Sequence, residues 1–223
     1  ARILKKEVSD GIIAPGFEPE ALEILSSKKG GKFICLEANA NFTAPQCEFR
    51  ELHGLVMSQR RNERLLTPED MQNVVSSGGG PLPADAVRDL VLASITLKYT
   101  QSNSVGYAYR GQMIGVGAGQ QSRVDCVKLA GRKARVWWMR QHEKVRSLQF
   151  KEGTKRSDRV NARVRYIEGD ITDAERPIWE ANFESVPELM DVSEQDAWMA
   201  SLSGVCLSSD AFFPFRDTLA HAS

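Results

Sequence analysis

One stretch of the chain, residues 99–123, combines side chains that could bind a small anionic ligand. It contains an amide at Asn103, a glycine-rich segment at 115–119 and a guanidinium at Arg123. An amide donates and accepts hydrogen bonds at once, and a guanidinium pairs with carboxylate or phosphate groups. This combination favours a planar, anionic ligand with hydrogen-bonding edges, such as a nucleotide.

The glycine-rich segment has two interpretations. GVGAGQ has the spacing G-x-G-x-G, so it matches neither the G-x-G-x-x-G of a dinucleotide-binding turn nor a P-loop. It indicates a close backbone approach at a strand end, followed by a helix that begins near Ser122 and offers free N–H groups to an anion. The alternative is a tight strand-to-helix turn that binds nothing.

Arg123 and Asn103 also have structural alternatives. Arg123 falls in the first turn of the predicted helix, where a cation opposes the helix dipole, so we expect a ligand or a buried acid beside it. Asn103 could bind a carboxamide or a purine-like edge, or it could form an Asx-turn. The segment SSDAFFPFRD, at 208–217, suits the wall of a site for a flat ring, or else is a core strand with a capping aspartate at its end.

The composition argues against several classes of protein. Lys plus Arg and Asp plus Glu are equal at 29 each, so no charge excess favours nucleic acid or an anionic membrane. No apolar run approaches the about 20 residues of a membrane span, and no signal peptide begins the chain. The four cysteines and three histidines lack metal-ligand spacing, which predicts no metal site and reduced thiols in a cytosolic protein. We find no Ser-His-Asp or Cys-His order that indicates nucleophilic catalysis.

Apolar and amphipathic segments alternate, which predicts an α/β fold. In the first part we expect a helix from Pro19, a helix start with a capping box at Thr67–Asp70, and three strands at 10–16, 32–38 and 49–61. The strand at 32–38 is apolar on both faces, which is typical of a strand buried on both sides. The linker-like run SSGGGPLP predicts a boundary between a first subdomain, 1–80, and a second, 81–223.

The second part begins with a predicted helix whose apolar face runs from Val87 to Leu97. A hairpin follows and turns at Arg110-Gly111. Further helices are expected at 122–140, from 143, at 155–166 and at 193–202, the last with a capping box at Ser193–Asp196. A strand and a turn are expected within 205–217.

Four motifs, in order along the chain, resemble one family. EVSDGIIAPG, KYTQSNSV, IGVGAGQQSR and SSDAFFPFRD are similar to the transformylase part of the bifunctional AICAR transformylase/IMP cyclohydrolases of purine biosynthesis. LAGRKARVWWMRQH and VPEL also fit. That family transfers a formyl group from 10-formyltetrahydrofolate to the 5-amino group of AICAR, and a separate N-terminal domain closes the ring to IMP. The resemblance implies two cytidine-deaminase-like α/β subdomains and a cytosolic homodimer that shares its site; the zinc signature of the deaminases is absent.

The resemblance also implies roles for particular residues. The positions similar to AICAR contacts of the family are Asp10, Asn103, Arg123 and Phe212. The AICAR amine is a weak nucleophile, because its lone pair is delocalised into the ring that bears the carboxamide. Asn103 and Arg123 could hold the carboxamide so that the amine faces the formyl carbon, and most of the rate gain would come from positioning.

Two positions resemble the folate contacts of the family: Val124, where some relatives carry isoleucine, and Asp217. Thr218 follows Asp217 where relatives often carry asparagine. The Lys-His pair of the family, whose histidine is the proposed general base, belongs upstream of ARILKKEVSD, and the 223 residues contain no Lys-His pair. We therefore expect an internal fragment that is inactive alone. The alternative is a natural truncated protein that binds a nucleotide or a partner without catalysis.

Overall fold

The computed structural model describes residues 1–75, 80–213, 216 and 220–221. These residues form two compact units, 1–64 and 65–223. Both contain helices and small sheets, so the predicted α/β class is confirmed. The predicted subdomain boundary between residues 80 and 81 adjoins residues outside the described part of the chain, and it stays a prediction.

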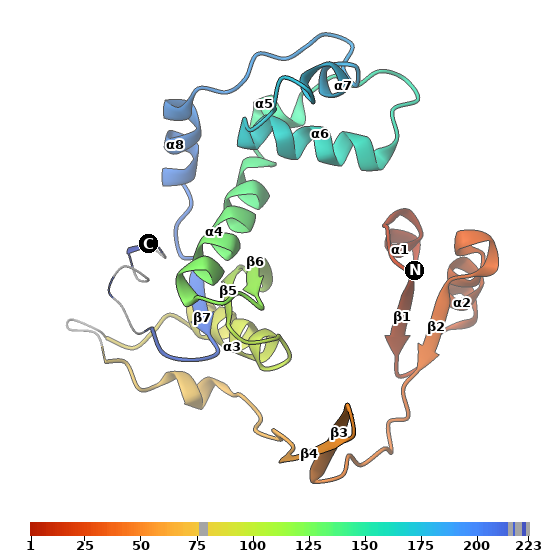
Figure 1. Cartoon of the computed structure of the whole chain (residues 1–223), viewed down its shortest axis with the longest axis vertical. Coiled ribbons are helices and arrows are strands. Elements are labelled where there is room, and N and C mark those ends of the chain that lie inside the picture. The colour runs from red at the N-terminus through yellow and green to blue at the C-terminus, as the bar shows by residue number, and fades with distance from the viewer. Residues whose placement is uncertain (76–79, 214–215, 217–219, 222–223) are drawn as a thin grey trace. The chain divides into compact units, whose positions relative to one another are not determined.

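The unit 1–64 contains a small parallel sheet of two strands (Figure 1). Strand β1 (Gly11–Ala14) pairs with β2 (Ile34–Glu37) in the register Gly11 to Ile34. Helix α2 (Pro19–Ser26) connects them, and proline occupies its first turn as expected, because this position needs no N–H donor. The short helix α1 (Arg2–Lys6) precedes β1, and the 3₁₀ turn η1 (Lys28–Gly31) precedes β2. Leu25 and Phe33 are buried in this unit.

The prediction that the strand at 32–38 is buried on both faces is wrong. Ile34 and Leu36 are 55% and 54% exposed. The physical reason is the size of the sheet, because two strands with one connecting helix leave most of the apolar surface of β2 uncovered.

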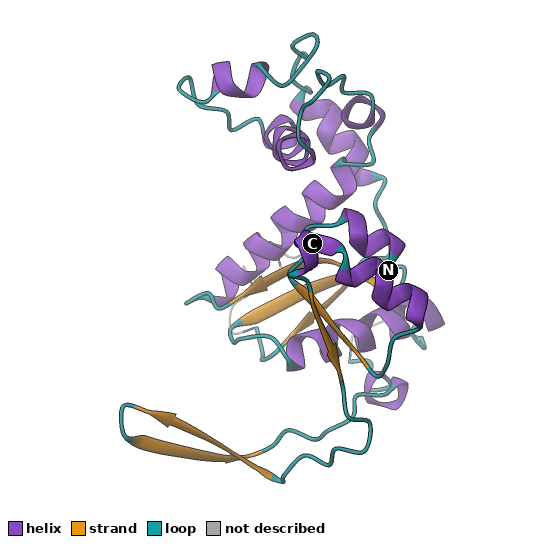
Figure 2. Cartoon of the chain, turned by 90° about the vertical axis from the view of Figure 1, so that its right-hand side faces the viewer, coloured by secondary structure: helices purple, strands orange, loops and turns teal. Residues whose placement is uncertain are grey.

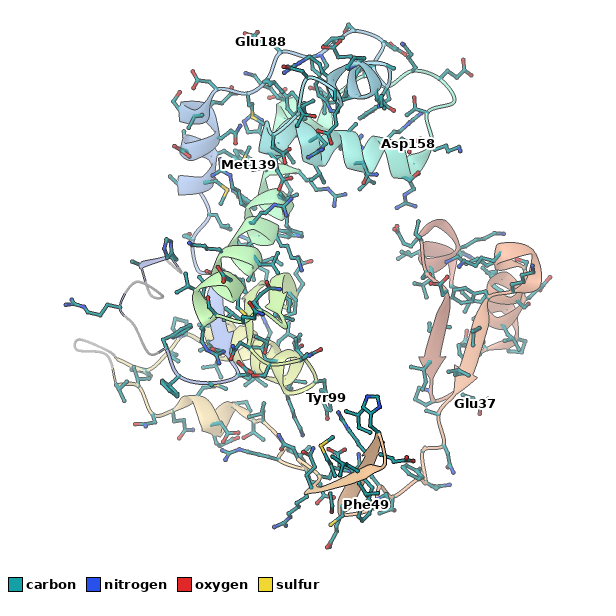
Figure 3. The ribbon with its side chains drawn as sticks, viewed as in Figure 1. Glu37, Phe49, Tyr99, Met139, Asp158 and Glu188 are labelled. Atoms are coloured by element: carbon teal, nitrogen blue, oxygen red, sulfur yellow. The ribbon has the colours of Figure 1, made fainter. Side chains whose placement is uncertain are left out.

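The segment 49–61 was expected to form one strand, and that prediction is wrong. It belongs to an antiparallel hairpin of β3 (Cys47–Leu52) and β4 (Leu55–Arg60). The turn residues His53 and Gly54 have positive φ angles of 50° and 79°, as a type I′ turn requires. His-Gly is a weaker turn signal than Asn-Gly, so the sequence did not indicate that the chain reverses direction here. Figure 3 labels Phe49 on this hairpin, where its side chain is 68% exposed.

The unit 65–223 is built on a three-stranded antiparallel sheet with the order β6-β5-β7. Its strands are β5 (Ser104–Tyr109), β6 (Gln112–Ala118) and β7 (Cys206–Ser209). The expected hairpin turn is confirmed, with Arg110 and Gly111 at φ angles of 50° and 78°. All six residues of β5 are buried, because this strand lies in the middle of the sheet.

Two helices cover the opposite faces of this sheet, as Figure 2 shows. Helix α3 (Ala84–Lys98) packs on β5 and β7, and Leu97 lies beside Gly106. Helix α4 (Arg123–Met139) packs on β6 and β5. The alternation along β5 divides its side chains between the two helices. The core on the α4 side contains Val105, Tyr107, Tyr109, Ile114, Cys126, Val127, Ala130 and Ala134. The predicted helix start at Thr67 forms a 3₁₀ turn, η2 (Pro68–Met71), with the expected capping box.

A second core lies beyond the end of α4, where Figure 3 labels Met139. Helices α5 (Glu143–Arg146), α6 (Arg156–Glu168) and α7 (Arg176–Glu180) contribute to it together with the segments that connect them. Its buried residues are Met139, Val145, Leu148, Ala162, Tyr166, Ile167, Ile171, Trp179, Phe183 and Met190.

Helix α8 (Val192–Ala200) returns along the chain to contact α4. The predicted capping box at Ser193 is wrong, because Asp191 caps this helix and accepts a hydrogen bond from the Ser193 N–H at 3.0 Å. Within the described residues, no helix combines the length and the apolar character that a membrane crossing requires.

Candidate functional site

The hairpin brings Asn103 and Arg123 together. Asn103 directly precedes β5, and Arg123 is the first residue of α4. Because β6 returns antiparallel to β5, Ser104 pairs with Ala118, and the chain enters α4 at the same end of the sheet. The Gly119 N–H then donates to the Asn103 carbonyl oxygen at 2.9 Å. Twenty residues of sequence separation thus become a direct contact between two side chains.

The guanidinium of Arg123 is enclosed by acceptors from three segments. Its Nη2 donates to Asn103 Oδ1 at 2.8 Å. Its Nη1 donates to Ser209 Oγ at 3.0 Å and to the Ser104 carbonyl oxygen at 3.3 Å, and it forms an ion pair with Asp210. Only 9% of the Arg123 side chain is exposed. The arginine therefore connects the starts of β5 and α4 to the end of β7.

Asp210 supplies the negative charge that the position of Arg123 requires, and 17% of its side chain is exposed. It follows β7, and its Oδ1 accepts a hydrogen bond from the Ser104 N–H at 3.0 Å. Burial raises the pKa of Asp210, but hydrogen bonds from Ser102, the Ser104 N–H and Arg123 outweigh burial and leave this pKa below its ordinary value. Sequence reasoning did not single out Asp210. The available signal was an arginine in a first helical turn, where a cation needs a nearby negative charge.

The glycines of the 115–119 segment serve packing and turning. A Cβ at Gly115 would lie 2.2 Å from the Ala130 carbonyl oxygen, and a Cβ at Gly117 would lie 2.1 Å from that of Cys126. Both distances are far below van der Waals contact, so glycine is needed for α4 to approach β6 this closely. Gly119 has a φ of 65° and makes the turn toward α4. Close packing on α4 and the turn into α4 are therefore enough to explain glycine at these positions.

The N-terminus of α4 is capped from within the chain. Ser122 Oγ accepts a hydrogen bond from the Asp125 N–H at 3.1 Å. The side chain of Asn103 donates to the carbonyl oxygens of Gln120 and Gln121 at 3.2 and 3.5 Å. These bonds orient the amide of Asn103 so that its Oδ1 faces Arg123.

The N–H groups of Arg123 that have no hydrogen-bond partner within the described part of the chain determine which ligand atoms this site can bind. The Nε–H and one Nη2–H have no partner among the described residues, which leaves two hydrogen-bond donors for an incoming oxygen atom. Cys126 is the nearest thiol and donates to the Asn103 carbonyl oxygen at 3.1 Å. Burial raises the pKa of Cys126, so the thiol stays protonated at neutral pH and is a poor nucleophile. The geometry suits binding and orientation of a ligand.

The other predicted site residues have different surroundings. Val124 follows Arg123 on α4 and is half-buried. Phe212 lies two residues after Asp210 and is 79% exposed. Asp217 and Thr218 lie outside the described residues.

Asp10 belongs to the unit 1–64, where it precedes β1 and forms an ion pair with Lys29. Its pKa is lowered by the hydrogen bond from Lys29 and by the charge of that lysine. Within the described part of the chain, no three His, Cys, Asp or Glu side chains come together as a metal site would require.

These features define an α/β protein with a polar Arg–Asn pair at one edge of its sheet. The family model described as "AICARFT/IMPCHase bienzyme" matches residues 1–133, and the chain belongs to this family. The match includes Asp10, Asn103, Arg123 and Val124, and it ends before Phe212.

Two curated relatives carry the name bifunctional purine biosynthesis protein PurH. The relative from Roseobacter denitrificans is 36% identical over 124 residues, which are 55% of this chain and 23% of the relative. The relative from Prochlorococcus marinus is 36% identical over 130 residues, which are 58% of this chain and 25% of the relative. The matched part of the chain thus spans about a quarter of the length of these relatives.

Proposed function

We propose that this chain is part of an AICAR transformylase, which transfers a formyl group from 10-formyltetrahydrofolate to AICAR in purine biosynthesis. The whole protein would also carry IMP cyclohydrolase activity. The family membership and the names of the two relatives support this proposal. The observation that carries it is the bond between Arg123 and Asn103, because it holds two residues with the proposed AICAR-binding role in one small site.

The pair would act by orienting the AICAR carboxamide. The two remaining N–H donors of Arg123 are suited to the carboxamide oxygen, and Asn103 Oδ1 keeps a lone pair for a ligand N–H. Held in this way, the neighbouring amine would face the formyl carbon of the folate. Positioning two reactants can remove a large part of the activation barrier of reactions between two molecules. Phe212 and Asp10 are the two other AICAR contacts that we propose from the family motifs.

The folate would lie beside the AICAR. Val124 is adjacent to Arg123 on α4 and only half-buried, so its apolar side chain is available to a folate ring. We propose Asp217 as the second folate contact. The general base that removes the amine proton is not part of the binding pair, because general bases in enzymes are imidazole, carboxylate, amine, phenol or thiol groups rather than guanidinium or amide groups.

We also propose the finer architecture and assembly that the family resemblance implies. The chain would contribute the end of one cytidine-deaminase-like subdomain and most of a second, with no zinc. The sheet of β5, β6 and β7, covered by α3 and α4, is compatible with such a subdomain. The complete enzyme would be a cytosolic homodimer with a shared site.

The test is AICAR binding and formyl transfer in the bienzyme that contains this chain. We expect Asn103→Ala and Arg123→Ala each to weaken AICAR binding by about 1–3 kcal/mol in calorimetric titrations, as loss of a hydrogen bond to a charged or oriented group does. Lys128→Ala is the matched control, since Lys128 is an exposed residue of the same helix. Unchanged AICAR affinity in both site variants would contradict the residue assignment, and absence of formyl transfer by the wild-type bienzyme would contradict the function.

A further inference from the structure

Three arginines gather near the end of α4 that is opposite to the Asn103–Arg123 pair. Arg140 follows the last residue of α4, and Arg159 and Arg163 lie on α6. Since α4 has 17 residues and rises about 1.5 Å per residue, about 25 Å separates its two ends. We call Arg140, Arg159 and Arg163 the arginine cluster.

Phe150 holds two members of the cluster in place. The guanidinium carbon of Arg163 lies 4.8 Å from the centroid of the Phe150 ring, and that of Arg159 lies 5.8 Å from it. Phe150 is itself stacked on Phe183, with 4.9 Å between centroids. Arg159 Nε also donates to the Thr154 carbonyl oxygen at 3.0 Å. Both half-buried guanidiniums are thereby fixed before any ligand arrives, and their terminal nitrogens form no hydrogen bond among the described residues.

Among the described residues, Arg140, Arg159 and Arg163 form no ion pair with a carboxylate. Three acids on or after α6 pair with other arginines: Glu168 pairs with Arg132, and Asp170 and Glu175 pair with Arg165. Asp158 precedes Arg159 in the first turn of α6 and accepts a hydrogen bond from Ser157 Oγ at 3.3 Å. Burial lowers the pKa of Arg163, and the charges of Arg140 and Arg159 lower it further. The cluster is therefore a local excess of positive charge in a chain whose formal net charge is zero.

Helix α6, which carries Arg159 and Arg163, adds to this excess. Arg159 lies near the N-terminus of α6, which begins at Arg156 and has the positive end of the helix dipole. An oxyanion bound there would interact favourably with the dipole and with the guanidiniums together. Fixed guanidiniums present pairs of N–H donors whose spacing matches phosphate oxygens.

We propose that the arginine cluster binds a phosphorylated small molecule at a site separate from the Asn103–Arg123 pair. Three guanidiniums match the charge of two linked phosphate groups. A small ligand fits better than nucleic acid, because a formal net charge of zero gives the chain no overall attraction for a polyanion.

The proposal is tested by titrating the full chain with inorganic pyrophosphate at constant ionic strength. We expect Arg159→Gln and Arg163→Gln each to weaken binding tenfold or more, since each removes a charge-assisted hydrogen bond. The matched control is Arg50→Gln, which removes the same charge from the exposed strand β3 in the unit 1–64. Pyrophosphate should also raise the melting temperature of the wild type and of Arg50→Gln, but not that of Arg163→Gln.

Three outcomes would overturn the proposal. They are no pyrophosphate binding by the wild type at millimolar concentration, equal binding by the cluster variants, and tighter binding of a single-stranded oligonucleotide at the same arginines. If Arg163→Gln fails to fold, Arg140→Gln provides the same test, because Arg140 is exposed. The titration contains no AICAR, so its failure leaves the proposed transformylase function untouched.

Discussion

Arg123 Nη2 donates a hydrogen bond of 2.8 Å to Asn103 Oδ1 and so joins the start of α4 to the start of β5. The same guanidinium pairs with Asp210 after β7. A cation in the first turn of a helix is unfavourable by itself, and here two neighbouring strands supply the oxygens that compensate it. The arginine thus fixes the edge of the sheet and presents its remaining donors to a ligand.

Replacement of Arg123 by lysine separates its charge from its geometry. A lysine ammonium retains the charge beside Asp210, but it cannot reproduce the planar set of donors that reaches Asn103 and Asp210 together. We expect Arg123→Lys to weaken AICAR binding by about 1–3 kcal/mol while destabilising the fold less than Arg123→Gln does. Calorimetric titration and urea unfolding measure the two effects. Arg146→Lys, at an exposed position of α5, is the control. Wild-type AICAR affinity in Arg123→Lys would show that the positive charge alone is enough for binding.

The ion pair of Asp210 predicts a pH dependence of stability. Its folded pKa lies below the unfolded value, for which 3.8 is the reference. The stabilisation is therefore fully present above about pH 4 and is lost as the pH falls through the folded pKa. We expect Asp210→Asn to lower the free energy of unfolding by about 1–3 kcal/mol at pH 7.

The difference between Asp210→Asn and the wild type should shrink toward zero in strongly acidic solution, because the wild-type carboxyl group is then neutral as well. Urea unfolding followed by circular dichroism at several pH values measures it. Asp173→Asn, at an exposed position, serves as the control. A difference that stays constant down to pH 2 would mean that Asp210 contributes by packing rather than by its charge.

Two glycines in the same part of the fold should respond in opposite ways to alanine. Gly117→Ala would place a Cβ 2.1 Å from the Cys126 carbonyl oxygen, so α4 would have to move, and we expect a loss of at least about 2 kcal/mol. Gly131 lies within α4, and the nearest atom to its Cβ would be Tyr107 Oη at 3.9 Å. Gly131→Ala should therefore stabilise the protein by about 0.5–1 kcal/mol through helix propensity. Thermal unfolding compares both, and equal melting temperatures would refute the packing argument.

Two tryptophans attach α8 to α4 through reciprocal hydrogen bonds. The indole N–H of Trp138 donates to the Trp198 carbonyl oxygen at 3.1 Å, and that of Trp198 donates to the Trp138 carbonyl oxygen at 3.2 Å. Their rings are stacked with 5.4 Å between centroids. We expect Trp198→Phe to lower stability by about 1–2 kcal/mol and to weaken the near-ultraviolet circular dichroism. Trp137→Phe is the control, because the Trp137 indole N–H has no hydrogen bond within the described residues. An equal loss of stability in Trp137→Phe would exclude a special role for the reciprocal bonds.

Local patterns were enough to predict much of the fold. Proline at the start of α2, the Thr67 capping box, the long helix before the hairpin, the Arg110-Gly111 turn and the long helix after Ser122 were all recognised correctly. Each depends on a few neighbouring residues, whose conformational preferences act over one or two turns of chain. The four family motifs likewise identified Asn103 and Arg123 as a pair.

The incorrect predictions concern features that neighbouring residues signal weakly, ambiguously or not at all. The hairpin turn at His53-Gly54 depends on two positive φ angles that His-Gly signals only weakly. The cap of α8 at Asp191 competed with an equally good pattern at Ser193. Exposure of Ile34 could not be foreseen, because burial depends on how many strands and helices pack beside a strand.

The sequence by itself determined the α/β class, the positions of most helices and strands, and the family to which the chain belongs. Only the tertiary structure decided that Asp210, 87 residues from Arg123, neutralises this arginine. It also decided that Gly115 and Gly117 serve the packing of α4 on β6. The reason is physical: propensities and capping act between neighbours in the chain, whereas charge compensation and close packing depend on distances in space, which sequence order does not contain.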